Sequence, residues 1–173
     1  MKHLPRPLVS KRFTIRGFYA AISIALLSFA SSAIAELGPF AGLAGDWSGS
    51  GRILLGNGTT ERIRCRAHYS VSAEGIRLQQ SLRCASDSYR FDLSSDVLSL
   101  GGQLSGVWNE ASRNMSGMLA GSARAGRFQV IVTSPSFSAN LTLTTHGDRQ
   151  SVEISAPPGG QLTGVSIALA RGK

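Results

Sequence analysis

The chain has 173 residues, the length of one domain, and carries 18 basic against 10 acidic residues, for a net charge of +8. Five of the basic residues precede residue 18, so the rest of the chain has a charge of only +3. This small excess gives little reason to expect nucleic acid as a partner. Aromatic residues make up only 7% of the chain, which is poor for the girdles of an outer-membrane barrel, and that alternative is therefore kept as the less favoured one.

The N-terminal part of the chain has the three-part layout of a secretory signal peptide. The basic segment 1–17 is followed by the apolar run 18–29 and then by small residues that end in an A-x-A site at Ala35. A membrane anchor is the alternative, but a span needs about 20 predominantly apolar residues. We expect cleavage after Ala35, so that residues 1–35 are the signal peptide. Residues 36–173 would then be a single domain in the periplasm or outside the cell.

After this segment, short stretches of alternating apolar and polar residues are separated by turn residues, a pattern typical of β-strands. They predict ten strands and an eleventh closing segment: 47–55, 59–71, 76–84, 89–93, 97–100, 103–109, 114–121, 127–133, 138–145, 151–155 and 161–170. A turn is expected at Ser94-Ser95-Asp96. The segments 97–100 and 103–109 are either two strands joined by a turn or one strand with a glycine bend at 101–102. Short connections favour an up-and-down antiparallel β-barrel of about eight to ten strands over a Greek-key sandwich.

Cys65 and Cys84 are the only cysteines, and in an exported chain two cysteines most simply form one disulfide. A metal pair would lack further ligands, and a redox pair normally has C-x-x-C spacing. Facing residues of an antiparallel hairpin have a constant sum of numbers, here 149. That register centres the turn on residues 74–75 and predicts a two-residue turn with Gly75 at positive φ.

The opposite face of this hairpin carries the most concentrated charge after residue 35. Its candidate anion-binding residues are Arg62, Arg64, Arg66, Arg77 and Arg83. Two interpretations stay open. The favoured one is an ordinary solvated sheet face, on which arginine stems cover apolar surface. The other is a face that binds lipid head groups, polyanions or an acidic partner.

The first predicted strand opens with the motif G-x-W-x-G-x-G, formed by Gly45, Trp47, Gly49 and Gly51. Tryptophan is bulky enough to plug a barrel end, and the glycines permit a bend and a close backbone approach. This opening resembles that of the calycins, which include the lipocalins and the fatty-acid-binding proteins. Gly49 and Gly51 also resemble those of nitrobindin-type haem barrels, and the stretch 43–47 resembles the opening of small periplasmic metalloprotease inhibitors.

The whole chain resembles a group of small exported bacterial proteins of unassigned function, through stretches such as 61–66 and 82–89. That resemblance implies a calycin-like barrel with a disulfide and brings no activity. The lipocalin resemblance implies a late basic residue at the tryptophan end, for which Arg171 is the candidate. A haem barrel implies a histidine ligand, but His68 falls on the arginine face and His146 falls in a turn.

Signatures of catalysis are missing from the sequence. There is no G-x-S-x-G motif and no metal-ligand spacing, and Asp92 and Asp96 lie near predicted turns, where solvated acids are expected. We therefore expect no enzyme, no metal and no cofactor. The predicted function is an exported, non-catalytic binding protein that carries a small apolar or amphipathic ligand. The alternative is a protein-interaction module, such as a protease inhibitor or an envelope-associated factor. Its expected partners are an unknown small ligand or protein, with an anionic surface as a candidate.

Overall fold

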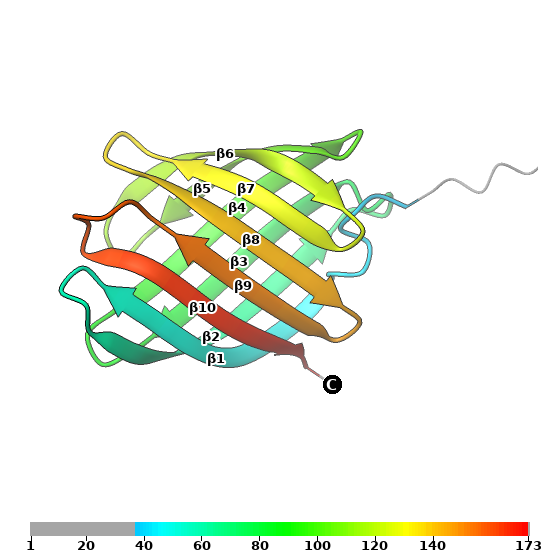
Figure 1. The fold of residues 1–173 in the computed structure, drawn as a ribbon. Helices are drawn as coiled ribbons and strands as arrows, with labels where there is room; N and C mark the ends of the chain where they lie inside the picture. Colours follow the sequence, from blue (N-terminus) through cyan, green and yellow to red (C-terminus); the bar gives the residue numbers. More distant parts are fainter. Residues whose placement is uncertain (1–36, 173) are drawn as a thin grey trace, which may run out of the picture. The chain divides into compact units, whose positions relative to one another are not determined.

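A computed structural model describes residues 37–172 (Figure 1), and the predicted signal peptide, residues 1–35, lies outside them. These residues form ten strands: β1 (Gly45–Leu55), β2 (Thr60–Val71), β3 (Arg77–Ala85), β4 (Arg90–Leu100), β5 (Gln103–Glu110), β6 (Met115–Arg124), β7 (Arg127–Thr133), β8 (Ser138–His146), β9 (Arg149–Ser155) and β10 (Leu162–Arg171). A search for helices long and apolar enough to cross a membrane finds none in this part of the chain.

Each strand pairs antiparallel with its neighbours in sequence, and β1 pairs with β10 to close the barrel. The closing register places Trp47 opposite Arg171 and Ile53 opposite Val165. Closure leaves no strand edge exposed, which removes the usual site of edge-to-edge aggregation. The predicted fold class, an all-β up-and-down antiparallel barrel, is confirmed.

The structure corrects the prediction along β4. Ser94, Ser95 and Asp96 lie inside this strand rather than in a turn, so the expected strands 89–93 and 97–100 are one strand. Their polar side chains serve the sheet, because the hydroxyl of Ser95 donates to Gln80 across the strand pair at 3.2 Å. Serine and aspartate favour turns, but they also form cross-strand hydrogen bonds.

A true turn follows at Gly101-Gly102, where the alternative of a single bent strand is wrong. Both glycines have positive φ, 56° and 79°, and they connect Leu100 directly to its partner Gln103. Two consecutive residues at positive φ are the requirement of a type I′ turn, which glycine meets without steric cost. β4 and β5 are therefore separate strands joined by a tight hairpin.

The cysteine hairpin has the predicted register. Cys65 faces Cys84 on β2 and β3, and the two form a disulfide. The turn is wider than expected, because residues 73–76 form the loop and the amide of Gly75 donates to the carbonyl of Ser72 at 2.9 Å. Gly75 has the expected positive φ, 71°. The loop is centred on the same point as the predicted turn, so the register is unchanged.

The glycines of the opening motif bring β1 close to β10. A Cβ atom on Gly49 or Gly51 would lie 1.9 Å from the carbonyl oxygen of Ala168 or Ser166, respectively. Any larger residue would force the two backbones apart at the point where the barrel closes. A second set of such contacts lies across the barrel on β5 and β6, at Gly106, Gly117 and Gly121.

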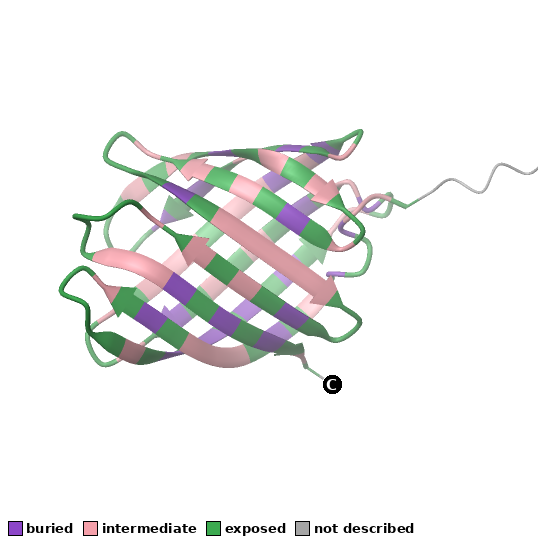
Figure 2. Ribbon diagram, in the orientation of Figure 1, coloured by how far each residue is buried: buried purple, intermediate pink, exposed green. Residues whose placement is uncertain are grey.

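Burial alternates along the strands, as Figure 2 shows for β9 and for most of β10, while β1 has a run of half-buried residues at 49–51. Apolar side chains such as Ile53 and Ile63 face the interior, and the residues that alternate with them along each strand face solvent. This pattern places the core inside the barrel. The end of the barrel that holds Trp47 is here called the closed end, and the end at which β1 reaches Leu55 is called the open end.

Candidate functional site

Trp47 fills the closed end and is 1% exposed. Its indole N–H donates to the carbonyl of Leu43 at 2.8 Å, so the ring's one polar group is satisfied inside the core. The guanidinium of Arg171 lies 4.4 Å above the ring centre, a cation–π contact. The structure thus places Arg171 where the lipocalin resemblance implied a basic residue.

Arg171 also ties the lead-in segment 37–44 to the barrel. Its guanidinium donates to the carbonyls of Gly42 and Ala44, and its Nε donates to Asp148 at 2.9 Å. No role was expected for this segment from the sequence. Its aromatic residue, Phe40, is nonetheless only 1% exposed. A large apolar residue in this short segment could have indicated that the segment packs against the core.

Further contacts pack the closed end. Phe40 stacks on Phe128 of β7 with ring centres 5.6 Å apart. The hydroxyl of Tyr69 donates to Gln150 at 2.8 Å. Burial raises the pKa of Tyr69 despite this hydrogen bond, so the phenol stays neutral and acts as a donor. These side chains fill the closed end.

The open end differs: Ile53 and Trp108 near it are buried, but many of its interior-facing apolar side chains are only half-buried. They pack against the core but keep accessible surface: Leu55, Tyr89, Phe91, Leu93, Met115, Val132, Ile154 and Leu162. Eight strands enclose an interior that side chains just fill or that holds one small ligand, and the diameter grows with strand number.

Two carboxylates hold the turns at the open end. Glu61 accepts hydrogen bonds from the hydroxyl of Ser86 at 2.7 Å and from the amide of Ser88 at 3.2 Å. Hydrogen bonds from the hydroxyls of Ser88 and Ser86 lower the pKa of Glu61. An ionised carboxylate in this position anchors the β3–β4 turn and is a poor proton donor.

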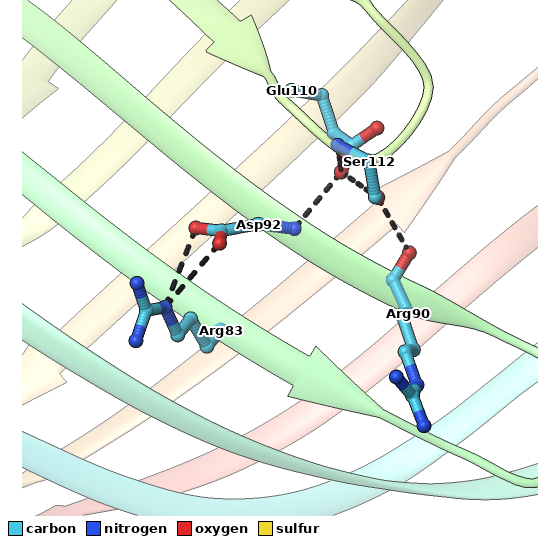
Figure 3. Close-up of polar contacts among 5 residues, drawn as sticks. All are labelled: Arg83, Arg90, Asp92, Glu110 and Ser112. Carbon is cyan, nitrogen blue, oxygen red and sulfur yellow. Dashed lines mark hydrogen bonds and ion pairs between the residues drawn. The ribbon is translucent and has the colours of Figure 1, made fainter.

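Glu110 holds the next turn in the same way and is 2% exposed. It accepts from the amide of Asp92 at 2.9 Å and from the hydroxyl and the amide of Ser112 (Figure 3). It also accepts from the amide of Arg113 at 2.9 Å. Desolvation raises the pKa of Glu110, but these hydrogen bonds together outweigh it and the pKa lies below its ordinary value. Asp92 and Asp96 were the acidic residues singled out from the sequence, and neither anchoring glutamate was expected.

A cation stands beside the aromatic residues of this rim. The guanidinium of Arg113, in the β5–β6 turn, lies 5.0 Å from the ring centre of Tyr89 and 4.9 Å from that of Phe91. The two rings stack with their centres 6.1 Å apart. The rim of the open end is therefore aromatic and cationic at one point, and this suits an amphipathic ligand better than a purely apolar one.

The outer surface of β1–β4 carries the second candidate site, a groove of about 710 Å³. We call it the arginine groove, after the five arginines that line it: Arg62, Arg64, Arg66, Arg83 and Arg90. Ser48, Ser50 and Ala85 are short side chains between them. Four of these arginines were expected together, and Arg90 joins them because β4 pairs with β3.

Asp92 links the groove to the open end. Its carboxylate lies 3.4 Å from Nε of Arg83 on the outer face, while its amide donates to Glu110 (Figure 3). Arg77, which was expected on this face, is held by Asp96 through contacts of 3.0 Å and 2.7 Å and does not line the groove. Arg77 therefore lies on the predicted outer face but outside the groove.

The two histidines considered as haem ligands lie away from the barrel interior. His68 is exposed on the outer face, with its Nδ1 2.7 Å from Asp46, and His146 is exposed at the end of β8. Among residues 37–172, no group of three or more potential ligands among His, Cys, Asp and Glu is placed to hold a metal ion. The described residues therefore do not fit a histidine-ligated haem inside the barrel.

Comparisons with known proteins agree with the fold. No protein-family model and no curated protein matches the chain. Among solved structures, Rv2717c from M. tuberculosis is similar with a TM-score of 0.62 at 12% identity, over 80% of this chain and 100% of that one. The S-type phycobiliprotein lyase CPES from Guillardia theta is similar with a TM-score of 0.57 at 11% identity, over 78% of this chain and 90% of that one. At these identities the likeness shows the fold alone, and it is compatible with a calycin-like barrel.

Proposed function

We propose that this protein is an exported carrier, which binds a small apolar or amphipathic ligand in the open end of its barrel. The observation that carries the proposal is the contrast inside the barrel. Apolar side chains such as Leu93 and Ile154 face the interior but stay half-buried, whereas Trp47 at the other end is fully buried. Half-buried apolar lining with a few polar groups is the usual character of a ligand site.

We propose carriage without catalysis. Glu61 and Glu110 are carboxylates at the open end, and each accepts hydrogen bonds that hold a turn. Their pKa values are lowered, so neither is suited to donate a proton near neutral pH. The neighbour described as a lyase shares 11% identity with this chain, and no residue role passes from it.

We also propose export, with residues 1–35 as the signal peptide. The Cys65–Cys84 disulfide supports a compartment outside the cytoplasm, because such bonds persist where the environment is oxidising. N-terminal sequencing of the protein purified from its own host tests this. A first residue of Glu36 would support export with cleavage, and an intact Met1 on membrane-bound material would overturn it.

Native mass spectrometry of the same material tests for a carrier. A bound small molecule that is released on unfolding is the expected result. Binding is then measured with the neutral apolar dye N-phenyl-1-naphthylamine, for the parent and for Leu93→Trp, which adds bulk inside the open end. The matched control is Val107→Trp, on the outer face. The proposal predicts that only Leu93→Trp loses the dye while both variants remain folded by circular dichroism. Equal dye binding by both variants would contradict it.

One observation favours the second candidate, a protein-interaction module. Val107, Met118 and Ile131 are exposed by 57%, 67% and 51% on the outer face of β5–β7, and Val107 faces Met118 across the strand pair. Clustered apolar residues on an outer sheet face are typical of protein contacts. A co-purifying protein in the native mass spectrum that Met118→Glu abolishes, with no small molecule bound, would favour this candidate over the carrier.

A further inference from the structure

The arginine groove concentrates like charges on one side of the barrel. The register places Arg66 directly opposite Arg83, and Arg52 of β1 directly opposite Arg62. Like charges in facing positions destabilise a sheet. Arg52 was not expected on this face, and it extends the cationic surface beyond the five arginines that line the groove.

These charges are poorly compensated within the chain. Among the described residues, Asp92 is the one carboxylate in ion-pair contact with a groove arginine, and it contacts Arg83. Arg62, Arg64, Arg66 and Arg90 have no ion-pair partner between residues 37 and 172. Arg77, by contrast, has its own carboxylate, Asp96, and lies outside the groove. Other arginines without an ion pair among the described residues, such as Arg52 and Arg113, lie outside the groove, but the groove brings four of them together.

The groove has room for a ligand between its cations. Ser48 faces Arg66 and Ser50 faces Arg64 across the β1–β2 pair, while Ala85 lies opposite Arg64 on the other side. Short side chains at these three positions leave the space of about 710 Å³ among the guanidinium groups. Alternate residues of one strand are roughly 6.7 Å apart and neighbouring strands are roughly 4.8 Å apart, so the cations form a closely spaced array.

We propose that the arginine groove binds a ligand that carries several closely spaced phosphate groups. Guanidinium donates two parallel hydrogen bonds to a phosphate, and the serine hydroxyls add neutral donors on the groove floor. A single phosphate would engage only one or two of the five arginines, so several phosphates fit the array better. This site lies on the outer face and does not depend on the ligand proposed for the interior.

The same phosphate chemistry is found in soluble polyphosphate compounds and on an anionic phospholipid surface. Two probes separate these sources. Inorganic tripolyphosphate is titrated by calorimetry, and vesicles of phosphatidylglycerol mixed with phosphatidylcholine are tested by co-sedimentation against vesicles of phosphatidylcholine alone. Both measurements are made at low and at physiological salt, because exposed charges are screened over about 8 Å at the higher ionic strength.

The test variant is Arg62→Gln/Arg64→Gln/Arg66→Gln, which removes three uncompensated charges from one strand. The matched control is Arg124→Gln/Arg127→Gln/Arg149→Gln, which removes three exposed arginines near the closed end. We expect the groove variant to weaken binding of at least one probe by about tenfold or more and the control by about twofold or less. Both variants should unfold at the same urea concentration as the parent or at a higher one, because like-charge repulsion is relieved.

Binding of tripolyphosphate that the groove variant loses would identify a soluble phosphate compound as the ligand. Loss confined to the anionic vesicles would identify a lipid surface. The proposal is overturned if the parent binds neither probe, or if the two variants weaken binding equally, since equal loss would reflect net charge alone. Dye binding in the interior, measured on the same variants, should not change, so failure here is distinct from failure of the carrier proposal.

Discussion

The two ends of the barrel are formed by the same strands but are stabilised differently. Trp47 and Phe128 at the closed end are 1% and 4% exposed, while Leu55 and Val132, on the same two strands, are half-buried at the open end. The lead-in segment makes this difference, because it covers only the closed end. The closed end is therefore held by apolar packing together with the contacts of Arg171, whereas the hydrogen bonds of two glutamates and a disulfide stabilise the open end.

The largest expected effect tests the packing of the closed end. Trp47→Ala removes a fully buried ring, its hydrogen bond to Leu43 and the contact of Arg171, and should lower the free energy of unfolding by about 3–5 kcal/mol. Leu55→Ala, at the open end of the same strand, should cost less than half as much, because its side chain is already partly solvated. Urea unfolding measures both. Equal losses would show that the two ends do not differ in packing.

Removal of the disulfide has the next largest expected effect. Cys65 and Cys84 are separated by 19 residues in sequence, and closing a loop of this length is worth roughly 3 kcal/mol in the chain-entropy model. The bond lies one residue from the open end of β3. In Cys65→Ala/Cys84→Ala we therefore expect hydrogen exchange to rise more at residues 60–65 and 82–90 than at residues 37–47. Uniform acceleration across the barrel would contradict this.

The sequence predicts the fold where several independent signals coincide. In the β2–β3 hairpin, residue alternation, the two cysteines and Gly75 all require the same register, and the structure has it. At Ser94-Ser95-Asp96 only composition was available, and it misled. Serine and aspartate residues that form hydrogen bonds across a strand pair have the same composition as a turn. Only their partners, Gln80 for Ser95 and Arg77 for Asp96, show that these residues belong to a strand.

The candidate sites were less accessible to sequence reasoning, because their residues meet only through the register of neighbouring strands. The row on β2 was visible as an alternation, but Arg52 and Arg90 join it through the β1–β2 and β3–β4 pairs. Glu61 accepts from Ser86 and Glu110 accepts from Asp92, and each pair is far apart in the sequence. No sequence motif has these spacings, so the contacts could not be predicted. The charge pattern therefore predicted the face, and the register was needed to define the groove.

The third prediction concerns the polar anchoring of the open end. Glu110→Gln replaces a nearly buried carboxylate that accepts from several donors, and should cost about 1.5–3 kcal/mol near neutral pH. The pKa of Glu110 lies below its ordinary value of 4.5, because hydrogen bonds outweigh the opposing effect of desolvation. Its contribution to stability is therefore fully present above pH 4.5 and is lost as the pH falls through the lower, folded-state pKa.

The parent should accordingly lose more stability between pH 7 and about pH 3 than Glu110→Gln does. Urea midpoints at the two pH values measure this difference. Glu153→Gln is the control, because Glu153 is exposed on the outer face of β9 and anchors no turn. If Glu110→Gln and the parent show the same pH dependence, the carboxylate of Glu110 is not ionised in the folded state and the assigned anchoring role is wrong.

The smallest expected effect separates Arg77 from the arginine groove. A hydrogen bond and the charge of Arg77 lower the pKa of Asp96, but the pair is exposed and screened by solvent. Exposed ion pairs contribute little to stability, so Arg77→Gln should leave the urea midpoint unchanged within error. The pKa of Asp96, followed by NMR, should rise toward its ordinary value of 3.8. Phosphate binding should also be unchanged in Arg77→Gln and weakened in Arg66→Gln, which removes the same charge from within the groove. If both substitutions weaken phosphate binding alike, the groove has no defined boundary and the whole face acts as a diffuse cationic surface.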